Sequence, residues 1–310
     1  MPVVSVKSIS KFYGKKKVLD NISFDINEGE VFGLLGSNGA GKSTITSILI
    51  GLEKKSSGEF TLFNGDKRKN IKSRIALVSQ EDSFYWNFTV KQNMYFFAAL
   101  SGFHASRAKK RIDFLLKWLH LDEFSSVVSE NLSGGYKKLL NIAISLIHDP
   151  ELIFFDEPTV GLDPKMRQIF WDKITELKKI KKTIILTTHY MDEAQKLCDR
   201  IALLKKGKLI AIGSPEELIS KYGGIRIVMF KIVGGVSDSD LNVVKEISGQ
   251  KDVFCKGEYM FIPFKEEKIV GRVSSISGYL MSKGYNILSS TTKEPTLEDV
   301  FLNIVGEQDD

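Results

Sequence analysis

Residues 36–44 read Gly36-Ser37-Asn38-Gly39-Ala40-Gly41-Lys42-Ser43-Thr44. They follow the apolar run Val31-Phe32-Gly33-Leu34-Leu35, which predicts a buried strand, and they lead into apolar positions spaced as one helix face. In this context the G-x-x-x-x-G-K-[ST] pattern predicts a phosphate-binding loop, whereas a plain glycine-rich turn would not need the Lys-Ser pair. The glycines let successive N–H groups point inward, and the helix N-terminus adds its positive dipole end. We therefore expect Lys42 to reach the β- and γ-phosphates of a nucleotide and Ser43 to ligate Mg²⁺.

Length and composition limit the class of protein. The chain has 310 residues, which favours one main domain and a smaller second one. The net charge of +6, from 44 basic and 38 acidic residues, weakly favours anionic ligands or a membrane surface, and a solvated surface is the simpler explanation. Cys198 and Cys255 lack metal-ligand spacing and fit a reducing compartment. Without a signal-peptide pattern or an uncharged apolar run of roughly 18 residues, we expect a soluble cytoplasmic protein that reaches a membrane only through a partner.

The segments around the loop predict a mixed architecture. Residues 22–26 and 60–63 read as antiparallel strands that flank the loop, rather than as part of a uniform βαβ series. The apolar strand 75–78 ends just before Gln80, which places that side chain at a strand carboxyl end, where ligands of α/β sheets gather. From about residue 89 to 148 the apolar period is helical, which predicts a helical insert between strands of the core.

Within this insert, Ser133, Gly134 and Gly135 stand where a helix begins. A helix start offers free N–H groups to an anion, so the stretch is a second candidate phosphate contact. Taken alone, it is explained as well by an N-cap followed by flexible glycines.

Two carboxylates follow the next predicted strand. The apolar run 152–155 carries Asp156 and Glu157 at its carboxyl end. Because unpaired buried carboxylates cost free energy, these groups should meet a cation. Asp156 is suited to holding Mg²⁺ directly or through water, and Glu157 is placed to polarise an attacking water. An acidic turn before Pro158 is the alternative, which the upstream phosphate loop disfavours.

Asp163 and His189 complete the set of candidate residues. Asp163 before Pro164 makes a suitable N-cap for a helix, and capping alone explains it. His189 follows the predicted strand 183–186, so it should face the same crevice as the carboxylates. A lone histidine is more often structural, and only this position favours a role in the site.

In this order and spacing, the motifs resemble the nucleotide-binding subunit of ABC transporters over roughly residues 3–220. The resemblance implies an α/β fold: a P-loop, RecA-like ATPase core with an antiparallel β subdomain and a helical subdomain of about residues 89–148. It places the ATP-binding domain at residues 1–222.

The resemblance also implies hydrolysis of ATP with Mg²⁺ at sites shared by two subunits, in a homodimer or with a paired ABC subunit. Lys42, Glu157 and His189 are the implied catalytic residues, and Ser43, Gln80 and Asp156 are the implied metal contacts. Ser133, Gly134 and Gly135 would act on the nucleotide of the opposite subunit, and Asp163 would lie at the dimer contact. The implied ATP-binding residues are Tyr13, Ser37, Asn38, Gly39, Ala40, Gly41, Lys42, Ser43, Thr44 and Gln80. Tyr13 would stack on adenine, although a packed aromatic near a turn explains it too.

Two positions depart from the family pattern. Tyr136 stands where the signature usually has Gln, and Val160 stands where a small Ser is common. Neither is expected to abolish activity, but they put the fine geometry and rate of the shared site in question.

Segments further along resemble the branch that serves exporters of drugs, lipids and polysaccharides. These segments are residues 187–194 and 294–302. In that branch a separate membrane permease carries the transmembrane helices, so the chain would be peripheral at the cytoplasmic face of the membrane. Residues 84–86, Phe-Tyr-Trp, would lie near the groove that receives the permease, although they could equally belong to the core.

Residues 223–310 predict a small α+β domain with the order β-α-β-β-α-β, followed by a closing helix. This order suggests a ferredoxin-like unit that supports a dimer or regulates it. No cluster of ligand-type residues indicates a small molecule for it.

Other functions remain open at this point. A soluble ABC ATPase acting on ribosomes usually joins two cassettes in one chain, and a DNA-maintenance ATPase carries a long coiled coil, which this insert is too short to form. A catalytically weak regulatory ATP-binding subunit would also fit the change at Tyr136. We expect no nucleic-acid partner.

Overall fold

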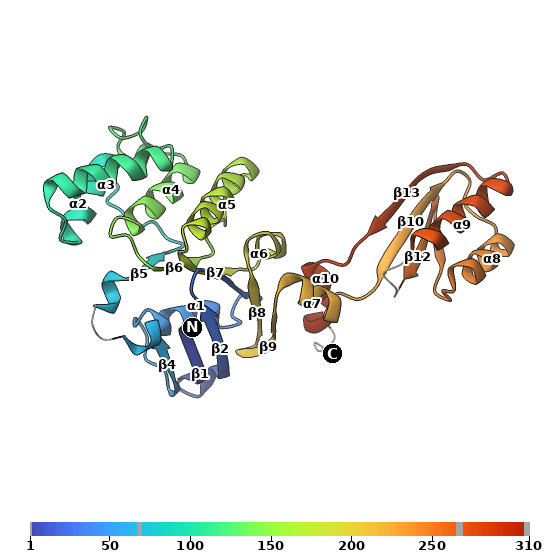
Figure 1. Ribbon diagram of the computed structural model, residues 1–310, viewed down its shortest axis with the longest axis horizontal. Coiled ribbons are helices and arrows are strands. Elements are labelled where there is room, and N and C mark those ends of the chain that lie inside the picture. The colour runs from blue at the N-terminus through green and yellow to red at the C-terminus, as the bar shows by residue number, and fades with distance from the viewer. Residues whose placement is uncertain (1, 67–69, 265–268, 307–310) are drawn as a thin grey trace. The chain divides into compact units, whose positions relative to one another are not determined.

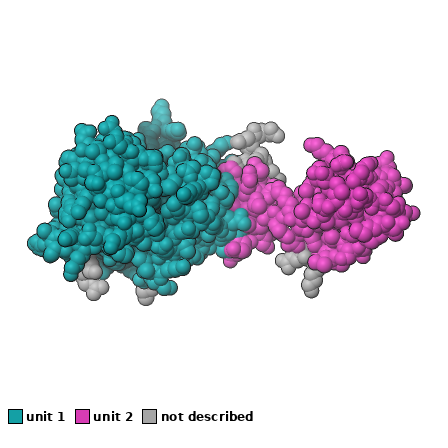
Figure 2. Space-filling view, turned by 90° about the horizontal axis from the view of Figure 1, so that it is seen from above, with its two compact units in different colours: residues 1–215 teal, residues 216–310 magenta. Residues whose placement is uncertain are grey.

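The computed structural model describes residues 2–66, 70–264 and 269–306. The chain divides into two compact units, residues 1–215 and 216–310 (Figure 2). The sequence predicts a domain boundary after residue 222, and the two compact units divide after residue 215. Among the described residues, no helix is both long enough and apolar enough to cross a bilayer.

Two β-sheets form the frame of the first unit (Figure 1). The larger sheet has the order β5-β6-β7-β3-β8-β9, in which the first five strands run parallel and β9 pairs antiparallel with β8. The smaller sheet is antiparallel and has the order β2-β1-β4. The strands are β1 (Pro2–Tyr13), β2 (Lys16–Asn27), β3 (Val31–Leu35), β4 (Ser57–Leu62), β5 (Ile75–Val78), β6 (Leu152–Asp156), β7 (Thr183–Thr188), β8 (Arg200–Lys205) and β9 (Lys208–Gly213).

The central strands are apolar because both faces of the larger sheet are buried. Every residue of β3 and β7 is buried, as expected for parallel strands with covered faces. Phe32 of β3 and Phe154 of β6 are fully enclosed, and Phe32 stacks on Phe24 of the smaller sheet at 5.2 Å between ring centroids. This contact joins the two sheets beneath the phosphate loop.

Three helices of the first unit form the predicted helical insert. These helices, α2, α3 and α4, lie together away from the smaller sheet (Figure 1). The helices are α1 (Lys42–Leu49), α2 (Val90–Leu100), α3 (Ala105–Trp118), α4 (Gly134–Ser145), α5 (Pro164–Lys179) and α6 (Met191–Leu197), and the 3-10 turns are η1 (Phe63–Gly65), η2 (Ile71–Ser73) and η3 (Ser129–Asn131). Helix α7 (Pro215–Tyr222) begins at the last residue of this unit and otherwise belongs to the second unit.

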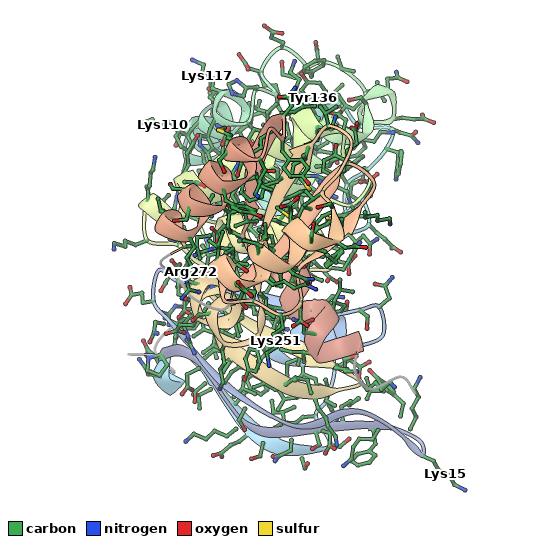
Figure 3. All side chains as sticks on the ribbon, turned by 90° about the vertical axis from the view of Figure 1, so that its right-hand side faces the viewer. Lys15, Lys110, Lys117, Tyr136, Lys251 and Arg272 are labelled. Carbon is green, nitrogen blue, oxygen red and sulfur yellow. The ribbon has the colours of Figure 1, made fainter. Side chains whose placement is uncertain are left out.

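Strand β1 is longer than the sequence suggests. The sequence predicts a strand over residues 3–6 and a polar turn from Lys11, whereas β1 continues to Tyr13. It does so because it pairs with β2 to the end of the hairpin, where Tyr13 faces Lys16. Lys15 lies in the turn that joins the two strands and projects from it (Figure 3).

The second unit has the predicted order of elements. Its four-stranded sheet has the order β11-β12-β10-β13, and helices α8 and α9 pack on one face around Phe230, Val244 and Ile276, which is the arrangement of a ferredoxin-like unit. Its elements are β10 (Arg226–Ile232), α8 (Asp238–Ser248), β11 (Phe254–Lys256), β12 (Tyr259–Phe264), α9 (Val270–Ser282), β13 (Ile287–Lys293) and α10 (Leu297–Gly306).

Asp240 gives the second unit a testable pH dependence. Its carboxylate accepts hydrogen bonds from the hydroxyls of Ser237, Tyr279 and Tyr285, which lower the pKa of Asp240 to about 2. A folded-state pKa below the unfolded value stabilises the fold above the unfolded pKa, and this contribution is lost as pH falls from about 4 to about 2. We therefore expect Asp240→Asn to lower the urea midpoint of the full chain at neutral pH, measured by circular dichroism. The difference from wild type should shrink over that acidic range, and a difference that grows there would contradict the assignment.

Candidate nucleotide site

The phosphate loop joins the end of β3 to the start of α1. Gly39 and Gly41 have φ angles of 80° and 106°, in the left-handed region that favours glycine. A Cβ atom on Gly41 would lie 2.6 Å from Leu19 Cδ2, and one on Gly36 would lie 2.5 Å from the Leu204 carbonyl oxygen. Close packing against two other strands therefore fixes the loop, and the first turn of α1 opens onto it.

Lys42 is held at the base of this loop. Its side chain is only 4% exposed, and Nζ donates to the carbonyl oxygens of Gly36 at 2.8 Å and Ser37 at 3.3 Å. Nζ also lies 3.3 Å from Oε1 of Glu157. The buried ammonium is thus neutralised by a carboxylate across the loop, which an anionic phosphate could replace.

Glu157 occupies a strained position directly after β6. Its φ angle is 47°, which non-glycine residues seldom adopt and which costs about 1–3 kcal/mol. Its backbone N–H donates to the carbonyl and the hydroxyl oxygens of Thr187, at 3.1 and 3.0 Å. These bonds hold the turn, so that Oε2 meets Nδ1 of His189 at 3.0 Å while Oε1 faces Lys42.

Ser43 and Asp156 form a second pair beside Lys42. The Ser43 hydroxyl donates to Oδ1 of Asp156 at 3.4 Å, and the Thr187 hydroxyl also donates to this oxygen. A hydroxyl and a carboxylate are hard oxygen ligands of the kind that hold Mg²⁺ together with phosphates and waters. The residues therefore fit the predicted ion, although no group of three or more acidic, His or Cys side chains forms a closed metal cage among the described residues.

Lys42, Ser43 and Glu157 line a pocket of about 590 Å³, whereas Asp156 and His189 contact these residues and are not part of its lining. Its walls include Tyr13, whose ring is 46% exposed, and the phosphate loop. The full lining is Tyr13, Lys16, Lys17, Val18, Asn38, Gly39, Gly41, Lys42, Ser43, Thr44, Glu157 and Lys206. The predicted residues Tyr13, Asn38, Gly39, Gly41, Lys42, Ser43, Thr44 and Glu157 are thus brought together in one site.

Three lysines of the pocket were not identified from the sequence. Lys16 and Lys17 lie on the first hairpin, and Lys206 lies in the turn between β8 and β9. The second hairpin reaches the loop because Gly207 N–H donates to the Ala40 carbonyl at 3.1 Å. In the sequence the only signal is a basic run at each turn, which is also typical of a solvated hairpin end.

Several predicted residues lie outside this pocket. Gln80 and Gly134 line a separate pocket of about 530 Å³. Ser133 caps α4 without a side-chain bond to the helix, and a Cβ atom on Gly134 would meet no atom within 4 Å. The start of α4 is therefore exposed and unoccupied by its own chain, whereas a Cβ atom on Gly135 would lie 2.6 Å from Met166.

Asp163 has a structural explanation in this chain. Its Oδ1 accepts from Met166 N–H at 3.0 Å and caps α5, whose first residue is Pro164. Its predicted place at a dimer contact stays a prediction.

The aromatic segment after Gln80 is divided between core and surface. Phe84 is buried, whereas Tyr85 and Trp86 are 49% and 45% exposed. The Asn93 side chain holds both backbone groups of Tyr85, and Lys137 Nζ lies 4.5 Å from the Trp86 ring centroid. The turn is therefore rigid, and it presents two large rings to solvent. Tyr136, where the family usually has Gln, packs on Phe124 at 4.2 Å between ring centroids.

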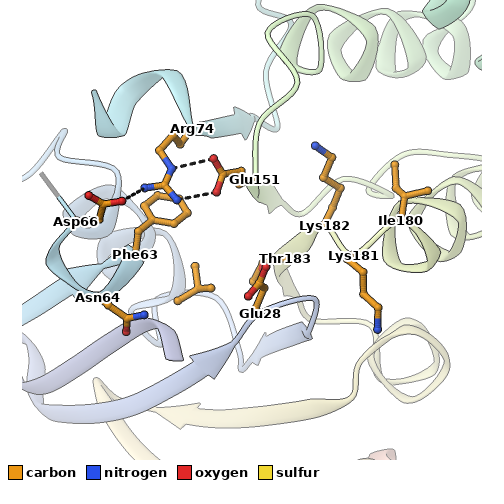
Figure 4. Close-up of a pocket in the computed structure, with 11 residues that line it drawn as sticks. Glu28, Phe63, Asn64, Asp66, Arg74, Glu151, Ile180, Lys181, Lys182 and Thr183 are labelled. Carbon is orange, nitrogen blue, oxygen red and sulfur yellow. Dashed lines mark hydrogen bonds and ion pairs between the residues drawn. The ribbon is translucent and has the colours of Figure 1, made fainter. Parts of the chain in front are cut away.

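Another pocket, larger than the one at the phosphate loop, lies near the amino ends of β6 and β7 (Figure 4). It measures about 650 Å³, and Arg74 lies over the Phe63 ring and pairs with both carboxylate oxygens of Glu151, at 2.9 and 2.6 Å. Paired charges of this kind tie η2 to the start of β6. They offer no phosphate loop, so this pocket is not the nucleotide site.

The phosphate loop, the carboxylates of Asp156 and Glu157 and the nearby His189 define a P-loop nucleotide hydrolase. Comparison with known proteins specifies it further: the family model described as "ABC transporter" matches residues 19–160. The linearmycin resistance ATP-binding protein LnrL of Bacillus subtilis (strain 168) is 36% identical over 307 residues, covering 98% of both chains. The Nod factor export ATP-binding protein I of Sinorhizobium fredii is 35% identical, over 98% of this chain and 86% of that protein.

Solved structures agree with this match. The structure of cbiO1 from Clostridium perfringens, described as part of the ABC transporter complex cbiONQ, superposes with a TM-score of 0.65 at 29% identity, over 71% of this chain and 91% of that one. This chain therefore belongs to the family of ABC transporter ATP-binding subunits, and it is an ATPase. The resemblance and the fold class predicted from the motifs are confirmed.

Proposed function

We propose that this chain powers a separate membrane permease, by closing as a dimer on Mg-ATP and reopening after hydrolysis. The observation that carries the proposal is the linked set of Lys42 and Glu157 in the pocket beside the phosphate loop, with His189 bonded to Glu157. In this set the Glu157 carboxylate is held in a fixed position between a cation and an imidazole. A group that activates water must be positioned in this way relative to the reacting phosphate.

The residues divide the work of phosphoryl transfer. Lys42 leaves Glu157 for the β- and γ-phosphates when ATP enters, which frees Oε1 to orient the attacking water. His189 keeps the carboxylate in place through Nδ1 and contacts the γ-phosphate with its other nitrogen. Ser43 and Asp156 would hold Mg²⁺, with Gln80 as a further predicted contact, and the ion would supply positive charge that offsets the charge on the phosphates. Catalysis is then mainly positioning and electrostatic stabilisation.

The exposed start of α4 supports a site completed by a second chain. Ser133 and Gly134 are exposed, and the Ser133 side chain makes no capping bond to α4. A Cβ atom on Gly134 would meet no described residue within 4 Å, so the N–H groups of this helix start are open to a ligand. In our proposal these groups bind the γ-phosphate of ATP held on the partner, in a homodimer or with a paired ABC subunit. The nucleotide then bridges the two chains, and its hydrolysis releases them.

Gly134→Asp tests this role. A Cβ atom at this position would meet no atom of the described residues within 4 Å, and an acidic residue in the first turn of a helix is favourable, so the fold should be kept. A carboxylate facing the partner's γ-phosphate should abolish ATP-dependent dimers and lower kcat at least about tenfold. Light scattering and phosphate release measure both effects.

Gly271→Asp is the matched control, since Gly271 lies in the first turn of α9 with equally open space. It should leave dimer formation and kcat unchanged. If Gly134→Asp also leaves both unchanged, α4 does not act on a partner's nucleotide.

Export is the direction favoured by the relatives. The printed names of two of them concern linearmycin resistance and Nod factor export, and the cbiO1 structure is described as part of a multi-subunit complex. The exposed rings of Tyr85 and Trp86 on the helical subdomain are suited to contact the permease. Such a contact would place the chain at the cytoplasmic face of the membrane.

Affinity purification of the full chain from detergent-solubilised membranes tests the transporter role. A multi-spanning protein should be recovered in stoichiometric amounts, and it should be lost when Tyr85 and Trp86 are both replaced by Ala. Recovery of ribosomes, or ATPase activity stimulated by nucleic acid, would instead favour the soluble ABC ATPase. ATP binding without any turnover, even with the permease, would favour a regulatory subunit.

A further inference from the structure

Glu193 is a fully buried carboxyl group behind the nucleotide site, and the mechanism above does not use it. It lies in α6, four residues after His189, and its exposed fraction is zero. Its Oε1 accepts a hydrogen bond from the indole N–H of Trp171 in α5 at 3.2 Å. Burial raises the pKa of Glu193, which favours the neutral acid.

Two threonine hydroxyls lie near the carboxyl group of Glu193. Among the described residues, neither Oε2 of Glu193 nor the buried Oγ1 of Thr159 has a hydrogen bond of ordinary length. The hydroxyls of Thr188 and Thr159 nevertheless lie near enough to oppose the rise in the pKa of Glu193. Thr188 Oγ1 already accepts from the Tyr190 N–H at 3.0 Å, so its own proton remains to be donated.

These contacts lead to the two loops that carry the reacting side chains. Thr159 stands two residues after Glu157, and Thr188 directly precedes His189. Trp171 belongs to the helix that follows the loop of Gly161 and Asp163. The Glu193 side chain therefore lies near the segments on both sides of the Glu157–His189 bond.

We propose that Glu193 is a positioning residue, whose buried carboxyl links Thr159 to Thr188 and thereby keeps Glu157 and His189 in register for hydrolysis. This inference rests on the roles proposed above for Glu157 and His189. A small approach of the two loops completes the missing hydrogen bond between Thr159 and Glu193, so the link is made or broken as the loops move.

A purely structural role explains these observations less well. A buried carboxyl without full hydrogen bonding is unfavourable, and an apolar side chain of similar size would fill the same space. Strained or incompletely satisfied groups of this kind concentrate where a segment must be held for function.

Amide and apolar substitutions separate the two explanations. Glu193→Gln keeps a donor and an acceptor in the shape of the neutral acid, so kcat and KM for ATP should stay within about twofold of wild type. Glu193→Leu removes the link and should lower kcat about tenfold, with KM within about twofold. This split is expected because the link acts on hydrolysis and not on ATP binding.

Thr159→Val provides a second test if Glu193→Leu fails to fold. It removes one hydroxyl at nearly constant volume and should lower kcat about threefold or more at unchanged KM. The double variant Thr159→Val/Glu193→Leu should be no slower than Glu193→Leu alone, since both break the same link. Thr183→Val is the control: Thr183 is buried at the other end of β7, where it accepts from Gly29 N–H, so it should change the melting temperature and not kcat.

These measurements separate the role of Glu193 from the roles proposed for Glu157 and His189. The positioning role is wrong if Glu193→Leu and Thr159→Val keep kcat within about twofold of wild type, or if Glu193→Gln is as slow as Glu193→Leu. If Glu157→Gln is impaired while these variants are not, only the inference about Glu193 fails. If Glu157→Gln itself keeps full turnover, the proposed site roles fail and the inference falls with them.

Discussion

Replacing Glu157 by Gln is expected to lower ATP turnover by at least about a hundredfold while ATP still binds. Oε1 of Glu157 lies 3.3 Å from Lys42 Nζ, and Oε2 lies 3.0 Å from His189 Nδ1, so the carboxylate is fixed between the two groups proposed to contact the phosphates. An amide has nearly the same shape, but it carries no charge and is a poor proton acceptor. The chain should therefore assemble its site and stop before hydrolysis.

Phosphate release under saturating Mg-ATP measures the loss, and calorimetric titration measures the retained binding. Glu151→Gln is a matched control, because Glu151 precedes the same strand at its other end and pairs with Arg74. It should affect stability and not kcat. Turnover within about threefold of wild type in Glu157→Gln would rule out Glu157 as the water-activating group.

The second large effect is expected for Lys42→Ala, which should weaken ATP binding by at least about a hundredfold. Lys42 is the buried cation of the pocket, fixed by the carbonyls of Gly36 and Ser37 so that its charge faces the loop. Its loss removes the positive charge proposed to bind the phosphates and leaves the Glu157 carboxylate without its neighbouring cation. Both changes disfavour the binding of an anionic ligand.

The measurement is the same calorimetric titration with Mg-ATP. Lys173→Ala is the control, because Lys173 is also buried but pairs with Glu176 in α5, away from the pocket. It should bind ATP as wild type does. If Lys42→Ala retains wild-type affinity, the loop at residues 36–44 is not the phosphate site.

The part of the site that could be predicted from the sequence is local in the chain. The phosphate loop and the pair Asp156 and Glu157 each follow a strand directly, so their type and spacing define their chemistry before folding. His189 follows its strand in the same way, and it lies beside Glu157, as the sequence predicts. The order of elements in the second unit was also readable, because each strand and helix has its own apolar period.

The part that could not be predicted depends on tertiary contacts. Lys206 reaches the pocket only because the β8–β9 turn docks on the phosphate loop through Gly207 and Ala40. Tyr13 was expected in a turn, whereas pairing with β2 extends the strand through it. Phe84 is buried while Tyr85 and Trp86 are exposed, because Asn93 fixes the backbone of Tyr85. The apolar periodicity of the sequence does not predict this difference.

We propose that the phosphate loop is half of a nucleotide site, which a second chain completes. The most direct test is the molar mass of the Glu157→Gln variant by light scattering, with and without Mg-ATP. We predict a mass of one chain, 34.8 kDa, without nucleotide, and twice that mass with Mg-ATP. A variant that binds ATP and keeps the mass of a single chain would contradict the claim.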